Sequence, residues 1–257
     1  MLSLLAADVV ERFLTMLWPM ARISALLLVA PVLPLDAVTV RIRIVFALVL
    51  TFFVYPLFDW PVIDPTSAAG LLELVNQITI GILMGLILQV VLAAVATGGQ
   101  AIAGSMGLSM ANMMDPNLGN VPVIASFLVI LASLIFLGLG GHVLLLELLI
   151  QSFEMLPIGQ GLLSLNAVGQ LLGWSSMMFL GAVLLALPLL VILLAVNLGL
   201  GVVVRAAPTL NIFAVGFPAM ILAGMAMLYI LMGAVGGRMQ WLWSAAFAQI
   251  RIVLGVE

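Results

Sequence analysis

Six long apolar stretches divide this sequence and leave only short polar breaks between them. They run over residues 13–35, 44–63, 71–96, 121–150, 171–204 and 212–235. About 20 apolar residues in a helix cross the roughly 30 Å hydrocarbon core of a bilayer. Because 66% of the residues are hydrophobic and 7% are charged, a soluble domain could not cover this surface with polar groups. The sequence therefore predicts an all-α, polytopic membrane protein with about six apolar helical segments.

The longest stretches and the C-terminal end carry further local signals. The fourth and fifth stretches exceed one crossing, so we expect them to tilt or to bend, at Pro188 and at the GLGGH run of 138–142. The last segment, GGRMQWLWSAAFAQIRIVLGVE, mixes Trp and Arg with apolar residues, which is typical of a helix at a membrane interface or on a partner. Arg41, Arg43 and Arg205 lie in the first and fifth breaks, which predicts that these breaks are cytoplasmic and both termini external.

Residue combinations that support catalysis are scarce. The chain has no cysteine and one histidine, His142, so it offers no thiol nucleophile and no HExxH zinc motif. Ser105 or Ser109 with His142 would be the one Ser–His pair, and it lacks an oxyanion-hole motif. Asp115 lies at a break beside a proline, whereas an aspartyl intramembrane protease needs two acids within its spans. We expect no enzymatic activity, cofactor or metal, and a net charge of −3 gives no nucleic-acid patch.

Four ionisable residues lie within or close to the apolar stretches and keep a transport function open as an alternative. They are Arg22, Glu73, His142 and Glu147. Arg22 needs an acid, a carbonyl cluster or water beside it, and pairing with a neighbouring helix explains it as well as a transport pathway does. His142 and Glu147 are interpreted as lying near a helix end, paired or solvated. A small-solute secondary transporter is therefore the alternative function, although no two halves show matching broken helices.

Small residues mark two faces suited to close helix packing. The GILMG run places Gly81 and Gly85 four residues apart, and the NLGLG run contains Asn197, Gly199 and Gly201. Such spacing lets helix backbones approach each other. Packing within the chain and packing between chains both fit the pattern.

The segment GSMGLSMANMMDP, residues 104–116, is unusually rich in methionine. Its methionines are spaced i, i+4, i+7 and i+8, which predicts one face of a short helix that ends before the Asp-Pro pair. An ordinary core stripe has the same spacing. Methionine also repacks easily against changing surfaces, and preceding glycines give the backbone freedom, so a movable apolar seal is the functional hypothesis. The methionines are Met106, Met110, Met113 and Met114, and the glycines are Gly98, Gly99, Gly104 and Gly107.

Two segments resemble the FliR/SpaR-like family of type III secretion export-gate subunits, and the resemblance extends over essentially the whole chain. One is GSMGLSMANMMDP, and the other is VNLGLGVVVRAAPTLNIFAVGFP at 196–218. The second is the more specific and matches the family at Asn197, Arg205, Pro208, Asn211, Phe213, Gly216 and Pro218. The flagellar branch is favoured over the virulence injectisome homologue.

This resemblance implies a core subunit of the flagellar protein export gate in the bacterial inner membrane, at the flagellar basal body, and not an enzyme. It implies assembly with FliP-like and FliQ-like subunits into a channel for unfolded flagellar proteins, and contact with FlhA-like and FlhB-like components. It also implies a FliP-like part over 1–170, fused to a FliQ-like hairpin with a C-terminal interfacial helix over 171–257.

The resemblance further assigns roles to individual residues. The family's plug segment corresponds to the Met-rich stretch, although family members often carry phenylalanine there. Arg205 either pairs with an acid of a neighbouring component or caps the preceding carbonyls. The implied plug residues are Met106, Met110, Met113, Met114, Asp115 and Pro116, the implied hinge residues are Gly98, Gly99, Gly104 and Gly107, and the implied cytoplasmic turn contains Arg205, Pro208 and Asn211.

Overall fold

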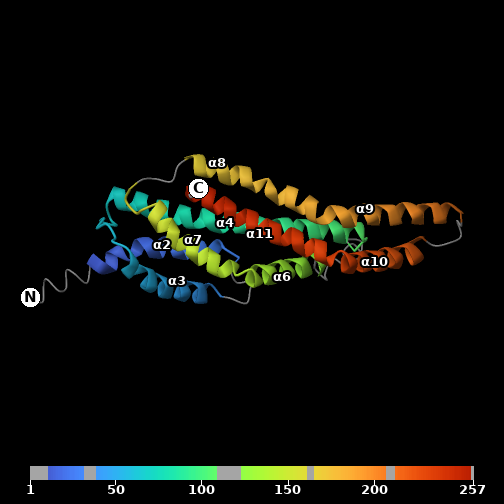
Figure 1. The fold of residues 1–257 in the computed structure, drawn as a ribbon, viewed down its shortest axis with the longest axis horizontal. Coiled ribbons are helices and arrows are strands. Elements are labelled where there is room, and N and C mark those ends of the chain that lie inside the picture. Colours follow the sequence, from blue (N-terminus) through green and yellow to red (C-terminus); the bar gives the residue numbers. More distant parts are fainter. Residues whose placement is uncertain (1–10, 32–38, 109–122, 161–164, 207–211, 256–257) are drawn as a thin grey trace, which may run out of the picture. The chain divides into compact units, whose positions relative to one another are not determined.

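The regular structure is helical in the computed structural model, which describes residues 11–31, 39–108, 123–160, 165–206 and 212–255. No strand occurs in these ranges, and the expected all-α class is confirmed. The helices (Figure 1) are α2 Leu17–Val29, α3 Val40–Val54, the 3-10 turn η1 Tyr55–Leu57, α4 Ala68–Ser105, α6 Val123–Gly138, α7 Gly141–Met155, α8 Leu165–Ser175, α9 Met177–Ala206, α10 Ile212–Ile230 and α11 Met232–Leu254.

Five helical stretches are long and apolar enough to cross a membrane, or six if α6 and α7 count as one broken span. The five are Glu11–Val29, Val40–Leu57, Ala68–Ser105, Asn166–Ala206 and Gly216–Leu254. This agrees with the expected polytopic fold. In the structure α11 follows α10 within one candidate span, Gly216–Leu254, and the position of the C-terminal segment at a membrane interface or on a partner stays a prediction.

The two expected bend positions behave differently. Between α6 and α7 the helix is interrupted at Gly140, inside the GLGGH run, where φ is +70°. Glycine adopts this left-handed conformation without the steric penalty of a Cβ. Pro188, by contrast, lies within α9, and that helix continues through it without interruption.

The chain divides into two compact units. Unit 1 comprises Met1–Val90, Gly140–Ser175 and Ala245–Glu257, and unit 2 comprises Val91–Leu139 and Ser176–Ser244. Both α4 and α11 contribute residues to each unit. These units are defined by contacts within the chain and do not test the predicted division into a FliP-like part over 1–170 and a FliQ-like part over 171–257. That division stays a prediction.

In unit 1, α2 packs closely on α4 through two glycines. A Cβ added at Gly81 would collide with the backbone oxygen of Arg22, and one at Gly85 would lie 2.8 Å from Val29 Cβ. The small-residue spacing of GILMG thus lets two backbones of the same chain approach. Trp18 of α2, with no exposed surface, lies in the core of this unit.

In unit 2, the first part of α11 packs inside its own unit. Trp243 lies with its ring 4.7 Å from that of Phe136 on α6, and its indole N–H donates to the carbonyl of Ala132 at 3.0 Å. A satisfied indole N–H and a buried ring together explain why tryptophan suits this position. The C-terminal segment therefore uses one face for packing within the chain.

Helices α9 and α10 lie side by side in unit 2 and form a helical hairpin (Figure 1). The residues that join them, 207–211, lie outside the described ranges. Consecutive helices joined by a short connection pack in this way in helical membrane proteins.

Candidate functional site

The first residues of the Met-rich segment lie at the C-terminal end of α4, and the described residues stop at Leu108. This helix ends at Ser105, and Met106, Gly107 and Leu108 form a turn. At Met106 the structure therefore has a turn where a helical methionine face was predicted. Met110, Met113, Met114, Asp115 and Pro116 lie outside the described residues, so their part of the predicted face and plug stays a prediction.

Gly107 explains why α4 stops here. Its φ of +80° is left-handed, its N–H donates to the Gly104 carbonyl at 3.0 Å, and the Leu108 N–H donates to the Ala103 carbonyl at 3.1 Å. This pair of bonds with a left-handed glycine is a Schellman motif, which satisfies the last carbonyls of a helix. A glycine first interpreted as a source of freedom therefore ends the helix in a defined geometry.

Met106 anchors this turn to α10. Its side chain has no exposed surface, and a Cβ added at Gly224 would lie 2.5 Å from Met106 Cε and 2.9 Å from its sulfur. Gly107 lies under the ring of Phe217, where an added Cβ would come within 3.2 Å. Neither Phe217 nor Gly224 was predicted as a site residue, although Gly224 is a small residue in an apolar helix, a known signal of close packing.

The other end of the Met-rich connection is also anchored in unit 2. Residue 123 begins α6, and Ala125 in its first turn lies against Gly99 of α4, where an added Cβ would be 2.6 Å from the Ala125 Cα. The described residues on either side of 109–122 thus make two close contacts: Gly99 packs on the Ala125 backbone, and the Met106 side chain packs on Gly224. We call these two contacts the loop anchors.

The four predicted hinge glycines occupy different environments. Gly98 and Gly99 are buried inside α4, and an added Cβ at Gly98 would lie 3.0 Å from the carbonyl oxygen of Ala182 on α9. Gly104 has no atom near the position of a Cβ, and Gly107 forms the turn. A hinge function of these glycines stays a prediction, and the contacts give Gly98 and Gly99 a packing function.

The described residues that were predicted to belong to the hairpin lie in the C-terminal part of α9. Asn197 is exposed, and Gly199 and Gly201 have nothing within 4 Å of an added Cβ. Arg205 lies exposed in the last turn of α9 and has no hydrogen bond or ion pair with any described residue. Pro208 and Asn211 fall outside the described ranges, so the composition of the cytoplasmic turn stays a prediction.

A polar network occupies the centre of unit 1 around Arg22, which has no exposed surface. Its Nε donates to Gln77 Oε1 at 2.6 Å, and its Nη2 donates to the Leu156 carbonyl at 2.8 Å. Its Nη1 donates to both the carbonyl (2.6 Å) and the hydroxyl (3.0 Å) of Ser152. Gln77 in turn donates to Glu73 Oε1 at 2.5 Å. We call Arg22, Glu73, Gln77 and Ser152 the Arg22 network.

This network ties α2 to α4 and to the end of α7. The Ser152 carbonyl lies in the last turn of α7 and also accepts the Leu156 N–H at 3.0 Å, and Leu156 directly follows the helix, where carbonyls lack partners along the helix. A guanidinium supplies several donors in a fixed plane, which suits it to this task. The sequence indicated that Arg22 needs a carbonyl cluster or an acid, and it could not name Ser152 or Leu156, more than 100 residues away.

The remaining candidate residues have local contacts. His142 lies exposed in the first turn of α7, and Glu147 accepts a hydrogen bond from Gln151 Nε2 at 3.2 Å. The hydroxyl of Ser105 donates to the Ala101 carbonyl of its own helix at 3.0 Å, a common use of serine in an apolar helix. Across the described ranges, no three His, Cys, Asp or Glu residues are grouped to hold a metal ion.

The chain is similar in sequence to known bacterial proteins. The family model for "Bacterial export proteins, family 1" matches residues 13–246. The flagellar biosynthetic protein FliR of Escherichia coli (strain K12) is 38% identical over 231 residues, which cover 90% of this chain and 88% of the relative. FliR of Pectobacterium carotovorum subsp. carotovorum is 36% identical over 255 residues, 99% of this chain and 98% of the relative. FliR of Bacillus subtilis (strain 168) is 30% identical over 232 residues, 89% of this chain and 90% of the relative.

Proposed function

The chain belongs to the bacterial export proteins, family 1, and we propose that it is a core subunit of the flagellar type III protein export gate. Its membership confirms the resemblance to the FliR/SpaR-like family. A flagellar protein export function and a membrane location follow from the family, the relatives' names and the apolar helices. The finer parts of the proposal concern its partners, its channel and the segment that closes it.

In this proposal the chain assembles with FliP-like and FliQ-like subunits in the inner membrane of the basal body and contacts FlhA-like and FlhB-like components. The outer face of α9 supports helical partners, because Leu194, Leu198 and Val202 are exposed there at helical spacing. The open space at Gly199 and Gly201 allows a neighbouring helix to approach. The α9–α10 pair takes the place of the FliQ-like hairpin, and Arg205 at its tip, unpaired within the described chain, pairs with an acid of a partner.

The proposed gate closes through the Met-rich segment between the loop anchors. A seal for a protein export channel has to exclude ions and water, and it also has to release unfolded segments of many sequences. Apolar, flexible side chains that bind weakly meet both demands, and methionine is such a side chain. The anchors support this role because they fix both ends of the segment and leave residues 109–122 between them.

The length of this segment is sufficient for a plug. A fully extended chain gains at most about 3.3–3.6 Å per residue, so a loop spanning 109–122 that returns to its origin can project about 20 Å. A helix with its side chains is about 10–12 Å wide, so the loop can cross a channel that admits a polypeptide. The two anchors are the single structural observation that carries the plug proposal.

The test replaces Met110, Met113 and Met114 together by alanine and keeps Met106, because Met106 packs on Gly224. We expect increased passive ion permeability of the cell membrane while flagellar protein export continues, because the seal loses its bulk and the anchors stay in place. Ion leakage is measured with a voltage-sensitive dye, and export is measured as secreted flagellar protein.

A matched control replaces Met155 and Met225, which are 42% and 49% exposed on α7 and α10, by alanine. This control should leave the membrane tight. An equal leak in the control would indicate a loosened fold, and a tight membrane in the triple variant would contradict the plug role.

A further inference from the structure

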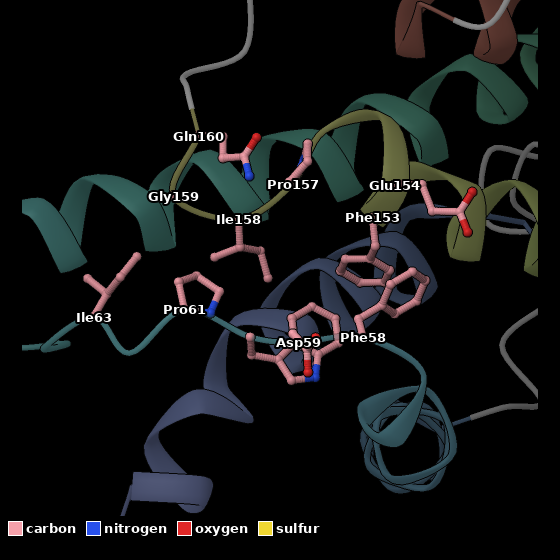
Figure 2. A pocket seen from close by; sticks show the side chains of 11 residues that line it. Phe58, Asp59, Pro61, Ile63, Phe153, Glu154, Pro157, Ile158, Gly159 and Gln160 are labelled. Carbon is pink, nitrogen blue, oxygen red and sulfur yellow. The ribbon is translucent and has the colours of Figure 1, made fainter.

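An open pocket of about 540 Å³ lies in unit 1, lined by residues of two segments (Figure 2). One wall is the segment after η1, from Phe58 to Ile63, and the other is the end of α7 with the turn that follows it, from Phe153 to Gln160. The first segment follows η1, and the second combines the last turn of α7 with the residues that follow it. The pocket therefore lies where η1 and α7 end.

One wall of this pocket is aromatic and packs against Arg22. The Arg22 guanidinium lies 4.3 Å from the centre of the Phe153 ring, and Trp60 meets that ring edge-on at 5.3 Å. Trp60 also donates its indole N–H to the Tyr55 carbonyl at 2.8 Å. Figure 2 shows the Phe58 and Phe153 side chains next to each other. A wall that is ordered before binding reduces the entropy lost when a ligand binds.

The opposite side of the pocket is apolar and closely packed. Gly159, with φ of +79°, lies against the 58–63 segment, where an added Cβ would be 3.1 Å from Ile63 Cδ1 and 3.6 Å from Pro61 Cγ. Ile158 faces Pro61 across the pocket (Figure 2). These contacts leave a hollow that accommodates an apolar or aromatic side chain.

The rim of the pocket is negatively charged and lacks a cation. Asp59 and Glu154 line it, both are exposed, and neither has a hydrogen bond or an ion pair with any described residue. A neighbouring hollow of about 350 Å³ shares Asp59 and is also lined by Glu11 and Arg12. Asp59 and Glu154 therefore offer unused negative charge to a ligand.

Asp64, close by in the sequence, differs from Asp59 and Glu154 because its carboxylate has hydrogen-bond partners in its own turn. Its Oδ1 accepts hydrogen bonds from the Thr66 N–H at 2.9 Å and the Thr66 hydroxyl at 2.8 Å. These bonds hold the pKa of Asp64 below its ordinary value. Asp59 and Glu154 differ because no turn of the chain uses them.

We propose that this pocket docks an extended segment of a partner protein, which inserts an apolar or aromatic side chain against Phe153 and Ile158 and places a lysine or arginine beside Asp59 and Glu154. Phospholipid headgroups carry a phosphate, and two unpaired carboxylates repel that group. A protein segment with adjacent basic and apolar residues matches both the charge and the lining. The proposed docking uses residues other than those of the plug and goes beyond the proposed gate function.

The experiment uses the natural absence of cysteine in the chain. The exposed rim residue Gln160 is changed to cysteine, labelled with benzophenone maleimide, and photo-crosslinked in membranes that contain the complete flagellar apparatus. We expect a crosslink to one defined peptide with a lysine or arginine close to an apolar residue. The combined Asp59→Lys and Glu154→Lys changes should lower the crosslink yield roughly 3- to 30-fold, as expected for the loss of two exposed ion pairs.

Glu147→Lys is the matched control, because it reverses an exposed carboxylate two turns earlier on α7 that does not line the pocket. This control should keep the yield, and a partner in which the crosslinked cation is changed to glutamate should restore the yield of the double lysine variant. If the lysine variants reduce the amount of protein, Asp59→Asn with Glu154→Gln replaces them. An adduct with a phospholipid, a peptide without a cation, no adduct, or a yield unchanged by the rim variants would overturn the proposal.

Discussion

At the scale of single residues, Arg22 shows how a guanidinium is accommodated among apolar helices. Four hydrogen bonds to Gln77, Ser152 and Leu156 use four of its five N–H donors, and the centre of the Phe153 ring lies 4.3 Å from its Cζ. A buried cation without such partners would be strongly unfavourable. The same side chain contacts the C-terminal end of α7 and the Phe153 ring, so it links the core of unit 1 to the proposed docking pocket.

Arg22→Lys tests whether the planar donor arrangement matters beyond the charge. Lysine keeps the cation but cannot reach Gln77 and the two α7 carbonyls together, so we expect the free energy of unfolding to fall by about 2–4 kcal/mol. Thermal unfolding of the detergent-solubilised protein measures this loss. Arg43→Lys is the control, because Arg43 is only partly buried and donates to the single carbonyl of Leu28. Equal unfolding temperatures for the two variants would contradict the structural role of the Arg22 network.

At the scale of elements, α4 shows which features of a helix the sequence predicts and which it does not. Its apolar run predicted a helix over 71–96, and the structure extends it from Ala68 to Ser105. The extension contains Gly98 and Gly99, which the sequence indicated as flexible. Glycine permits motion and also permits close backbone approach, and only the neighbouring Ala125 and Ala182 identify the second use. Those neighbours lie on other helices, so local sequence could not reveal them.

Alanine substitutions separate the two uses of glycine on this helix. Gly99→Ala would place a Cβ 2.6 Å from the Ala125 Cα, and a backbone atom cannot move aside cheaply. We expect it to lower the free energy of unfolding by about 1–3 kcal/mol, as overpacking does. Gly104→Ala meets no neighbouring atom and should leave stability unchanged or raise it by up to about 1 kcal/mol.

The readout for this pair is again the thermal unfolding temperature in detergent. Because both glycines lie on the same helix within a few residues, a difference between them reports packing and not helix propensity. If both variants lower the unfolding temperature equally, Gly99 does not have the packing role assigned to it.

At the scale of the whole molecule, the apolar surface exceeds what the chain can bury by itself. Within the five candidate spans the buried share ranges from 17% for Val40–Leu57 to 56% for Ala68–Ser105. Lipid or other helices must cover the rest. The sequence predicted the helical class and the number of apolar segments, because both follow from composition and run length. It could not predict which faces meet partners, because a lipid-facing and a partner-facing leucine look alike in sequence.

The whole-molecule prediction concerns assembly. Extracted in mild detergent, the protein should co-purify with other membrane subunits, and native mass spectrometry should give a mass well above the 27.2 kDa of the single chain. The exposed helix faces are the physical reason, because a helical partner covers them better than detergent does. A purified chain in lipid vesicles should take up no small solute. A stable species of 27.2 kDa with solute uptake would support the transporter alternative instead.

The loop anchors also have a consequence for how such a seal can diverge among relatives. The entropy of closing a loop grows slowly with its length, by only about 0.6 kcal/mol for each doubling. Insertions, deletions and exchanges between methionine and phenylalanine inside 109–122 are therefore cheap for the fold, whereas a side chain at Gly99, Gly107 or Gly224 meets a neighbour or a left-handed backbone. Evolution can thus adjust the proposed seal to different cargo while the residues that flank it stay the same.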